Sequence, residues 1–350
     1  MELAIIGAGM AGLAAARQLR ETRPDLAITI FDKSRGVGGR AATRRMNGAV
    51  FDHGAQYLKA PTPELTALIR QTLAHETLVD IGMPVWTFDG ANQIAAGDPA
   101  QNDEAKWTYR DGLTRLAKEL ARDLNVRRET RLGRIELAGG GYQLYDDQGA
   151  ALGSADAVLF TPPAPQTAAL IEASALPDVA KTTIRQELAQ ARYRPCLTLT
   201  LGYPATLRER PFYALVNSDR RHPISWLAYE HRKPGRESDD QHMLIAQMAP
   251  GWSEQHWSDP EPLLAEQIND MLADLLAEPL PAPRWTNRQG WRYALPDSGA
   301  DFDTLNSAQP GLFFAGDFTA GQGRLHRAIE EGWRVSRVIA EQLATSQRAD

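Results

Sequence analysis

Residues 1–40 read MELAIIGAGMAGLAAARQLRETRPDLAITIFDKSRGVGGR, and this stretch decides the fold. A short apolar strand, 3–6, runs into the glycine-rich stretch GAGMAG at 7–12, and an Ala- and Leu-rich helix follows. A second strand, 28–31, ends at Asp32, twenty residues after Gly12. Strand, glycines, helix, strand and acid in this order predict a dinucleotide-binding βαβ unit.

Each part of this fingerprint has a physical task. Gly7 permits the tight turn, Gly9 lets the backbone approach a pyrophosphate, and Gly12 allows close packing of helix and strand. The helix N-terminus attracts the phosphates, and the acid accepts hydrogen bonds from ribose hydroxyls. The binding residues predicted from this unit are Gly7, Gly9, Met10, Ala11, Gly12, Asp32 and Lys33.

The next residues, KSRGVGGRAAT at 33–43, indicate which dinucleotide binds. They resemble the second motif of flavoproteins of the glutathione-reductase and amine-oxidase class. The resemblance implies that Gly39 and Arg40 embrace the pyrophosphate of FAD, a task that suits the rigid guanidinium fork. A solvated basic loop is the alternative, but it would leave the glycines without a purpose.

Composition is that of an ordinary globular enzyme. The chain has 350 residues, of which 43% are hydrophobic and 23% charged, and this length allows two domains. The net charge of −6 argues against nucleic acid as the main partner. Cys196 is the only cysteine, which fits a reducing compartment, and no His/Cys cluster has the spacing of a metal site. The sequence has no run of membrane-spanning length, and Glu2 argues against a signal peptide, so we expect a cytoplasmic protein without membrane contact.

The domains are expected to be interleaved in an α/β fold. We assign 1–60, 104–164 and 299–350 to a Rossmann-like FAD-binding domain. Segments 61–103 and 165–298 form a substrate domain with a mixed or antiparallel sheet. Strands at 196–201, 224–229 and 243–248 and helices near 180–192 and 261–276 build most of it. The polar stretch 233–241 is interpreted as a connecting loop.

Two further segments resemble parts of the FAD domain in this class. The strand DAVLFTPPA at 156–164 resembles the one that closes its middle part, which implies cofactor contacts at Thr161 and at the backbone near Leu132. GLFFAGD at 311–317 and GQGRLHRAIEEG at 321–332 resemble a strand whose terminal acid binds the ribityl chain, followed by a helix aimed at the flavin N1/C2 edge. A helix N-terminus there stabilises the anionic reduced flavin. An ordinary strand–loop–helix without a ligand is the alternative. For His326, the sequence favours a flavin contact and a solvent-facing position equally. The residues implied by the C-terminal motif are Gly316, Asp317, Arg324, Leu325, His326 and Ala328.

Together these motifs resemble an FAD-dependent oxidoreductase of the hydroxybenzoate-hydroxylase or amine-oxidase architecture. Within that class, GGRAATR at 38–44, FDHGAQY at 51–57 and TPPAPQ at 161–166 resemble the renalase family, its bacterial members above all. The resemblance implies cofactor contacts at His53, Gly54, Ala55 and Gln56. The FAD is expected to be non-covalent. A covalent link would need a cysteine near the C-terminal flavin motif, whereas Cys196 lies in a predicted substrate-domain strand.

The renalase resemblance implies a reaction. Its members oxidise 2- or 6-dihydro isomers of NAD(P)H to NAD(P)+, with hydride going to flavin N5 and O2 reduced to H2O2. Many amine oxidases hold a water near N5 with a lysine from a late strand, but no lysine follows Lys233. A flavin amine oxidase acting on a small or aromatic amine stays open as an alternative, as does a non-catalytic flavin-binding module. The expected partners are a small-molecule substrate and O2, and the chain is expected to be a monomer or a homodimer.

The candidate catalytic residues lie in the segments that would meet the substrate. We expect Gln56, Tyr57, Trp226 and Trp291 at the reactive face of the flavin. His53 is a possible base, although DHG at 52–54 favours a role in supporting the loop. Tyr229 and Tyr293 are further aromatic residues that could line the site, but such residues are more often part of a core.

Overall fold

The chain forms two compact units in the computed structural model, which describes residues 1–346. Within these residues, unit 1 comprises 1–41, 114–193 and 295–346, and unit 2 comprises 42–113 and 194–294. Both units are therefore built from separate segments, and the α/β class with two interleaved parts agrees with the prediction.

Unit 1 is organised around a five-stranded parallel sheet in the order β19-β13-β1-β2-β9. In its centre Ile6 pairs with Phe31 on one side and with Phe160 on the other, so three strands end at the same edge. The strands are β1 (Glu2–Ile6), β2 (Ala27–Phe31), β9 (Val126–Arg127), β13 (Ala157–Phe160) and β19 (Leu312–Phe314).

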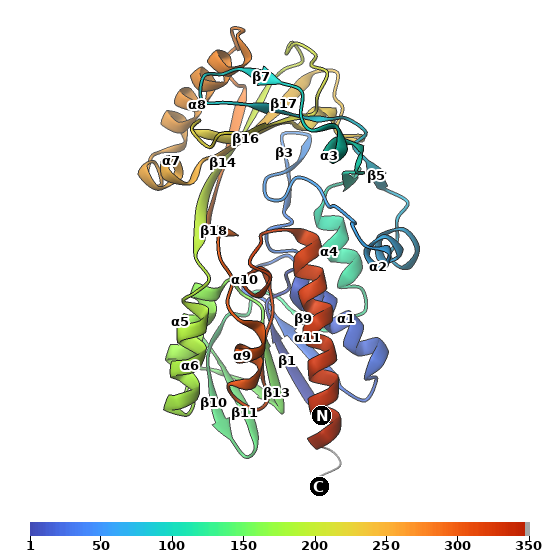
Figure 1. Cartoon of the computed structure of the whole chain (residues 1–350), viewed down its shortest axis with the longest axis vertical. Coiled ribbons are helices and arrows are strands. Elements are labelled where there is room, and N and C mark those ends of the chain that lie inside the picture. Colours follow the sequence, from blue (N-terminus) through green and yellow to red (C-terminus); the bar gives the residue numbers. More distant parts are fainter. Residues whose placement is uncertain (347–350) are drawn as a thin grey trace. The chain divides into compact units, whose positions relative to one another are not determined.

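The two faces of this sheet are covered differently because side chains alternate along a strand. Ala4, Ile6, Val158 and Phe160 share one apolar core with the antiparallel three-stranded sheet β10-β11-β12 and with helices α5, α6 and α9. Helices α1 and α11 contact the sheet and lie side by side (Figure 1). The bounds are α1 (Met10–Thr22), α4 (Thr114–Leu120), β10 (Leu132–Ala138), β11 (Gly141–Asp146), β12 (Ala151–Ala155), α5 (Ala164–Ala173), α6 (Asp178–Leu188), α9 (Phe302–Ser307), α10 (Asp317–Ala320) and α11 (Leu325–Ser346).

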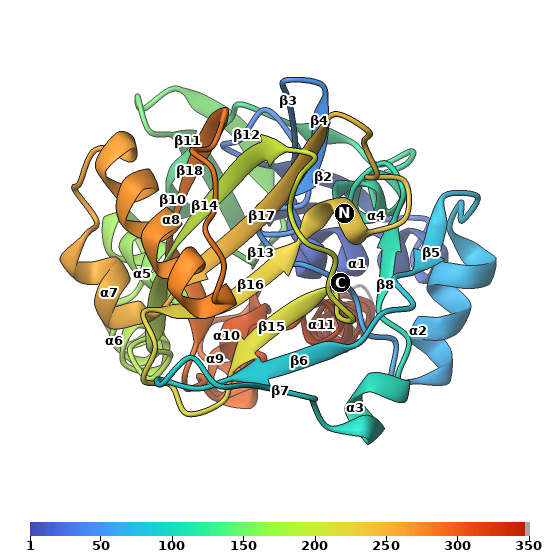
Figure 2. The same cartoon turned by 90° about the horizontal axis from the view of Figure 1, so that it is seen from above.

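Unit 2 is organised around a seven-stranded mixed sheet in the order β18-β14-β17-β16-β15-β6-β7 (Figure 2). Strands β14, β17, β16 and β15 pair antiparallel in turn, β15 pairs parallel with β6, and β6 pairs antiparallel with β7. Strand β16 and helix α8 have the bounds expected from the sequence. The elements are β6 (Val85–Phe88), β7 (Ile94–Ala95), β14 (Tyr193–Pro204), β15 (Ala214–Asn217), β16 (Ile224–Tyr229), β17 (Gln241–Met248), α7 (Pro250–Gln255), α8 (Glu261–Leu276) and β18 (Trp285–Pro296).

The two faces of this sheet also differ. Leu227, Leu244 and Ala246 share a core with the apolar face of α8, which covers one side of the sheet. Trp226, Ala228, Met243 and Ile245 point to the other side, where they pack with the hairpin of β3 and β4. The remaining elements are β3 (Thr43–Met46), β4 (Ala49–Asp52), α2 (Pro63–Ala67), the π-helical turn η1 (Leu68–Thr72), β5 (Leu78–Asp80), α3 (Pro99–Asp103), β8 (Trp107–Tyr109) and the 3-10 turn η2 (Glu230–Arg232).

The unit boundaries differ from the expected domain boundaries in four segments, the shortest of which, 295–298, was expected in the substrate domain but belongs to unit 1. Segments 42–60 and 104–113, expected in the FAD-binding domain, belong to unit 2, because Ala49 and Phe51 are part of the core beneath β16 and β17. Segment 165–193, expected in the substrate domain, belongs to unit 1, because α5 and α6 bury Ile171 and Ile184 against its sheets. Helix α6 ends at Leu188, four residues before its expected end. None of the helices within 1–346 combines the length and apolarity needed to cross a bilayer.

Candidate functional site

The first and third glycines of the fingerprint are required by the protein's own packing. Gly7 has φ +102°, and a Cβ on it would lie 2.6 Å from Thr161 Oγ1. A Cβ on Gly12 would lie 2.2 Å from the carbonyl oxygen of Gly7. Thr161 secures this turn because its hydroxyl donates to the carbonyl oxygen of Ile6 at 2.7 Å. Thr161 therefore supports the turn itself, and its contact with a cofactor stays a prediction.

The second glycine faces open space. A Cβ on Gly9 would meet no atom within 4 Å, although its φ of −81° is accessible to any residue. Helix α1 begins directly after it at Met10, and no side chain caps the helix. Its first N–H groups therefore lack helical partners and can bind an anion. A Cβ on Gly39 would lie 3.6 Å from Gly9 Cα, so the two glycine loops lie together and leave a cradle that fits a pyrophosphate.

The acid after the second strand is held firmly. Asp32 accepts hydrogen bonds from the backbone N–H groups of Ala8 and Ser34, both at 2.7 Å. Each carboxylate oxygen thus has one donor and keeps acceptor capacity for a ribose hydroxyl. Lys33 is exposed and donates to Gln166 Oε1 at 3.4 Å. The ribose contact of Asp32 and the cofactor contact of Lys33 stay predictions.

The second and third motifs meet in one ion pair, between a partly exposed arginine and a buried aspartate. Arg40 Nη1 lies 2.5 Å from Asp317 Oδ2, and Asp317 is only 4% exposed at the start of α10. The hydroxyl of Tyr193 donates to the other oxygen, Asp317 Oδ1, at 2.8 Å. Burial raises the pKa of Tyr193 well above its usual value, so this hydroxyl stays a donor. Sequence reasoning missed Tyr193 because it precedes a substrate-domain strand and belongs to no motif.

Helix α11 begins at Leu325, as the C-terminal motif predicts. A Cβ on Gly332 would lie 2.4 Å from the carbonyl oxygen of Ala11, so this glycine permits the close approach of α1 and α11. His326 is buried in the first turn, which excludes the solvent-facing alternative. Leu132 is buried at the start of β10. The flavin contacts of Gly316, Arg324, Leu325, His326, Ala328 and Leu132 stay predictions.

In unit 2, the loop after β4 is shaped by two glutamine side chains. Gln56 is buried, and its Nε2 donates to the carbonyl oxygens of Asp52 at 2.5 Å and Gly54 at 3.2 Å. Gln247 Nε2 on β17 donates to the same Gly54 oxygen at 2.7 Å. The amide nitrogen of Gln56 thus stabilises the loop 52–56, which includes Ala55. Direct catalytic and cofactor contacts of this loop stay predictions.

A fully buried cluster of four charges anchors this loop, which we call the ionic quartet: Asp52, Glu230, Lys233 and Arg236. Lys233 Nζ lies 2.7 Å from Glu230 Oε2 and 3.3 Å from Asp52 Oδ2. Arg236 lies 2.9 Å from Asp52 Oδ2 and also pairs with Glu230. Burial alone would raise the pKa of Asp52, but the charges of Lys233 and Arg236 and two hydrogen bonds lower it to about 2.

The quartet corrects the interpretation of 233–241 as a mere connecting loop. Lys233 and Arg236 have no exposed side-chain surface and supply both cations of the cluster. Lys233 Nζ also lies 3.5 Å from Gln56 Oε1. The charged residues with Pro and Gly in 230–236 are typical of a solvated turn, so nothing in the local sequence distinguished this one.

The predicted aromatic residues form two pairs. The rings of His53 and Trp291 stack with centroids 5.5 Å apart, and Trp291 Nε1 donates to the carbonyl oxygen of His53 at 3.0 Å. Tyr57 and Trp226 lie with centroids 6.1 Å apart. Burial, aided by the charge of Arg44, lowers the pKa of His53 to about 4, so the imidazole is neutral at pH 7.

Several buried polar atoms on these residues have no hydrogen-bond partner within the described part of the chain. They include His53 Nδ1, Trp226 Nε1 and Thr200 Oγ1. Thr200 pairs with Ile245 across β14 and β17, on the face of the sheet that carries Trp226. Buried polar groups are costly when unpaired, so these atoms mark a place where a ligand can supply partners.

Tyr229 does not belong with these residues. It lies three positions after Trp226 on β16, so its side chain points to the opposite face and packs in the core with Phe212. The period of two along a strand explains this outcome. Sequence reasoning also missed Arg44, whose guanidinium donates to Asn287 Oδ1 at 3.1 Å and Gln289 Oε1 at 3.5 Å on β18. Among the residues that the structure describes, no three His, Cys, Asp or Glu side chains gather as metal ligands, and the absence of a metal stays a prediction.

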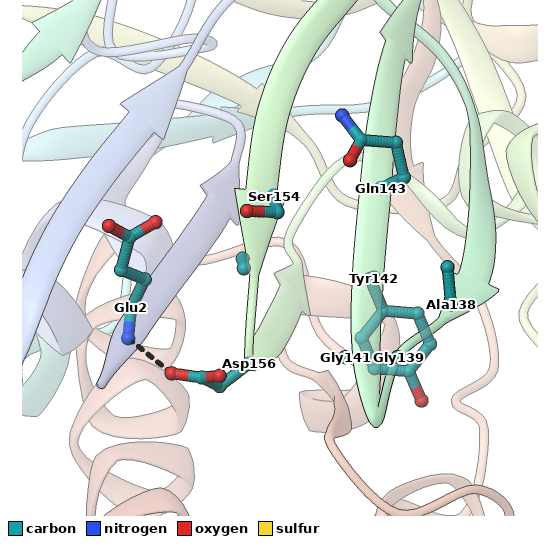
Figure 3. Close-up of a pocket in the computed structure, with 9 residues that line it drawn as sticks. Glu2, Ala138, Gly139, Gly141, Tyr142, Gln143, Ser154 and Asp156 are labelled. Atoms are coloured by element: carbon teal, nitrogen blue, oxygen red, sulfur yellow. Dashed lines mark hydrogen bonds between the residues drawn. The ribbon is translucent and has the colours of Figure 1, made fainter.

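A separate recess lies at the other end of the parallel sheet of unit 1. It is lined by residues such as Glu2, Tyr142 and Asp156, and the backbone N–H of Glu2 donates to Asp156 Oδ2 at 2.7 Å (Figure 3). Glu2 begins β1, whereas the fingerprint follows the carboxyl end of that strand. Ligands of open α/β sheets bind at the carboxyl ends of the strands, so this recess is unrelated to the cofactor cradle.

Comparisons with known proteins agree with this geometry. Residues 94–340 match the family described as flavin containing amine oxidoreductase, and residues 5–72 match the NAD(P)-binding Rossmann-like domain. Protoporphyrinogen oxidase 2 of Arabidopsis thaliana, chloroplastic/mitochondrial, is 36% identical over 67 residues, which make up 19% of this chain and only 13% of that protein.

Two solved structures share the fold over nearly the whole chain. A protein from Exiguobacterium sp. 255-15, assigned as a protoporphyrinogen oxidase, aligns with a TM-score of 0.78 at 18% identity and covers 97% of this chain and 99% of its own. Cyclohexylamine oxidase from Brevibacterium oxydans IH-35A aligns with a TM-score of 0.74 at 16% identity and covers 98% and 99%. At these identities the likeness concerns the fold alone.

The family match extends over more than half of the chain, and the glycine cradle with its flanking acids fits the ADP portion of a flavin dinucleotide. The cofactor is FAD, bound without a covalent link. The chain belongs to the flavin containing amine oxidoreductase family.

Proposed function

We propose that this chain is a renalase-like oxidase of dihydro-NAD(P) isomers, with the 2-dihydro isomer as the first substrate to test and the 6-dihydro isomer as the second. The segments 38–44, 51–57 and 161–166, which resemble renalases, support this proposal. The charge arrangement in unit 2 supports it independently.

The observation that carries the proposal is the neutralisation of the buried acids. Asp52 and Glu230 are each paired with both Lys233 and Arg236, so neither is left to bind an ammonium group. The charge of Arg44 acts on His53, and the guanidinium of Arg44 donates to two amide oxygens. The positive charge of Arg44 favours an anionic nicotinamide dinucleotide over a cationic amine. The aromatic rings do not decide between the two, because they can stack on a nicotinamide or attract an ammonium group.

The reaction requires little proton transfer from the protein. A dihydropyridine ring is a strong hydride donor, so the main task of the residues is to orient it. When bound, FAD would supply the hydride acceptor at N5, with O2 as the final oxidant. The balance is one dihydro-NAD(P), one proton and one O2 consumed, with one NAD(P)+ and one H2O2 formed.

In this proposal, four of the five predicted catalytic residues have roles that their contacts allow. Trp291 and Trp226 offer flat surfaces, and His53 Nδ1 and Trp226 Nε1 are unpaired groups that can meet the carboxamide of the nicotinamide ring. Gln56 and Lys233 hold the loop in shape. His53, being neutral, serves as a hydrogen-bonding group and a ring support.

The proposal is tested by anaerobic reduction of the purified flavoprotein. Mixing with 2-dihydro-NAD or 2-dihydro-NADP is expected to bleach the absorbance of the oxidised flavin within seconds. Ordinary NADH, the 4-dihydro isomer, is expected to bleach it far more slowly. On admission of O2 the flavin colour returns and H2O2 forms in equal amount to NAD(P)+. Rapid bleaching by amines alone would refute the proposal.

An amine oxidase is the second candidate, and the shared fold with cyclohexylamine oxidase favours testing it. The same experiment with a panel of small and aromatic amines decides between the two. A flavin that no compound reduces would instead indicate the non-catalytic module. A cytoplasmic location and a monomeric or homodimeric state complete the proposal and are checked by fractionation and light scattering.

A further inference from the structure

We propose that Arg44 is a substrate-binding residue that takes the pyrophosphate of the dinucleotide. This inference rests on the proposed function and names the part of the substrate that one side chain recognises. It starts from a guanidinium that the protein orients but does not neutralise.

The position of Arg44 follows from the register of the β3–β4 hairpin. Arg44 pairs with Phe51, and cross-strand partners point to the same face, so both side chains lie on the same side of the hairpin. Phe51 lies against the ring of Trp285 on β18 with centroids 5.6 Å apart. Arg44 reaches Asn287 and Gln289 on the same strand, two and four positions further along.

The aromatic pair described above continues this row. Residues 287, 289 and 291 alternate along β18 and share one face. Trp291 on that face stacks on His53, which follows β4 directly. One face of β18 therefore presents two amides that orient an arginine, followed by an indole. A nicotinamide dinucleotide carries the two matching groups, a pyrophosphate and a flat aromatic ring.

The charge of Arg44 is available to a ligand. Its hydrogen bonds go to two neutral amide oxygens, and within the described residues it makes no ion pair with a carboxylate. Arg236 and Arg210 of the same unit, by contrast, each pair with a glutamate. A guanidinium has five N–H donors in a fixed fork, so two amide contacts leave three donors for phosphate oxygens.

The adjacent Arg45 offers a matched control. It lies next to Arg44 on β3, is exposed, and donates to the carbonyl oxygen of Asp111 at 2.7 Å. Successive residues of a strand point to opposite faces, so Arg45 carries the same charge on the other side of the hairpin. A general electrostatic effect would involve both arginines, whereas a specific contact involves only Arg44.

The experiment compares the wild type with Arg44→Gln, Arg44→Lys and Arg45→Gln, each as FAD-loaded enzyme. Two substrates are used: 2-dihydro-NAD, and the 2-dihydro form of nicotinamide riboside, which lacks phosphates. The saturation of anaerobic flavin reduction gives an apparent Kd for each substrate. Calorimetric binding of ADP-ribose gives a second readout that needs no turnover.

Arg44→Gln is expected to raise the Kd for 2-dihydro-NAD and for ADP-ribose about ten- to a hundredfold, as for the loss of a charged hydrogen bond. The Kd for the riboside should change less than about twofold, Arg44→Lys should lie between, and Arg45→Gln should match the wild type.

Three results would overturn the inference: equal losses for both substrates, equal effects of Arg44→Gln and Arg45→Gln, or loss of FAD from Arg44→Gln, which would make Arg44 a cofactor ligand. If neither substrate reduces the wild type, the proposed function fails by itself. ADP-ribose binding then still decides whether Arg44 binds a pyrophosphate.

Discussion

Lys233 Nζ lies 2.7 Å from Glu230 Oε2, and neither side chain has any exposed surface. The same ammonium group reaches Asp52, 181 positions earlier in the chain. Glu230 in turn accepts a hydrogen bond from the backbone N–H of Asp52 at 2.9 Å. One short turn after β16 thus holds the end of β4, and with it the loop that carries His53 and Gln56.

Removing one cation from the ionic quartet should destabilise the protein strongly. Lys233→Met leaves two buried carboxylates with Arg236 alone, and breaking a buried ion pair costs about 3–5 kcal/mol. Urea unfolding of the FAD-loaded protein measures the loss. Arg185→Gln is the control, because the pair of Arg185 with Glu172 is about half exposed and should be worth less than about 1 kcal/mol. Equal effects of the two variants would contradict a structural role for the quartet.

Substitutions of the fingerprint glycines should have different effects on FAD binding and on folding stability. Gly9→Val places its side chain in open space, so the protein should fold but lose FAD. Gly12→Val drives its side chain into the carbonyl oxygen of Gly7 and should cost about 3 kcal/mol of folding stability. The ratio of flavin to protein absorbance and a thermal melt of each variant distinguish the outcomes. A Gly9→Val protein that retains full FAD content would show that the cradle is not the pyrophosphate site.

Asp317 should contribute to FAD affinity through its charge. Asp317→Asn removes the ion pair with Arg40 and leaves a weaker acceptor for the hydroxyl of Tyr193, so the guanidinium of Arg40 loses its fixed position. We expect the Kd for FAD, measured by fluorescence titration of the apoprotein, to rise about tenfold or more. Asp303→Asn serves as the control, because the side chain of Asp303 is 84% exposed and pairs with Arg334 at the surface. An unchanged FAD affinity in Asp317→Asn would argue against the expected ribityl contact.

Stability should fall as the pH is lowered below about 6.5. Burial lowers the pKa of both His53 and His231 to about 4, so the folded state resists their protonation while the unfolded state accepts it. Each imidazole therefore costs up to about 3 kcal/mol as the pH falls from 6.5 to 4. Asp52, with its pKa lowered to about 2, adds a loss in the same direction below pH 4.

Thermal unfolding between pH 4 and pH 8 measures this dependence, and the substitution His53→Gln should flatten part of it. The rate of flavin reduction should show no break near pH 6.5 from His53, because its imidazole stays neutral there. A break that disappears in His53→Gln would refute the assignment of a neutral histidine.

Local patterns in the sequence predicted much of this molecule. The strand, glycines and helix of residues 3–22 and the bounds of β16 and α8 follow from hydrophobic periodicity and from backbone requirements within a few residues. The faces of β16 were not predicted: Tyr229 was named with Trp226 as a residue that could line the site, but their separation by three positions places them on opposite sides of the sheet. Tyr193 was not predictable, because its partner Asp317 lies 124 positions away.

The sequence by itself therefore determined the class of cofactor. A pyrophosphate cradle is made of contiguous backbone, and its glycines can be recognised directly in the sequence. Only the tertiary structure decided which polar residues surround the loop at 52–57. In the sequence, Lys233 and Arg236 have the pattern of a solvated turn. In the structure, this turn connects the antiparallel strands β16 and β17, and both side chains are buried against Asp52. In the sequence, nothing distinguishes Arg44 from the other basic residues near it. In the structure, it donates to two amide oxygens on β18. The physical reason is that burial and charge compensation are set by neighbours distant in sequence, whereas turns and helix starts are set by neighbours in the chain.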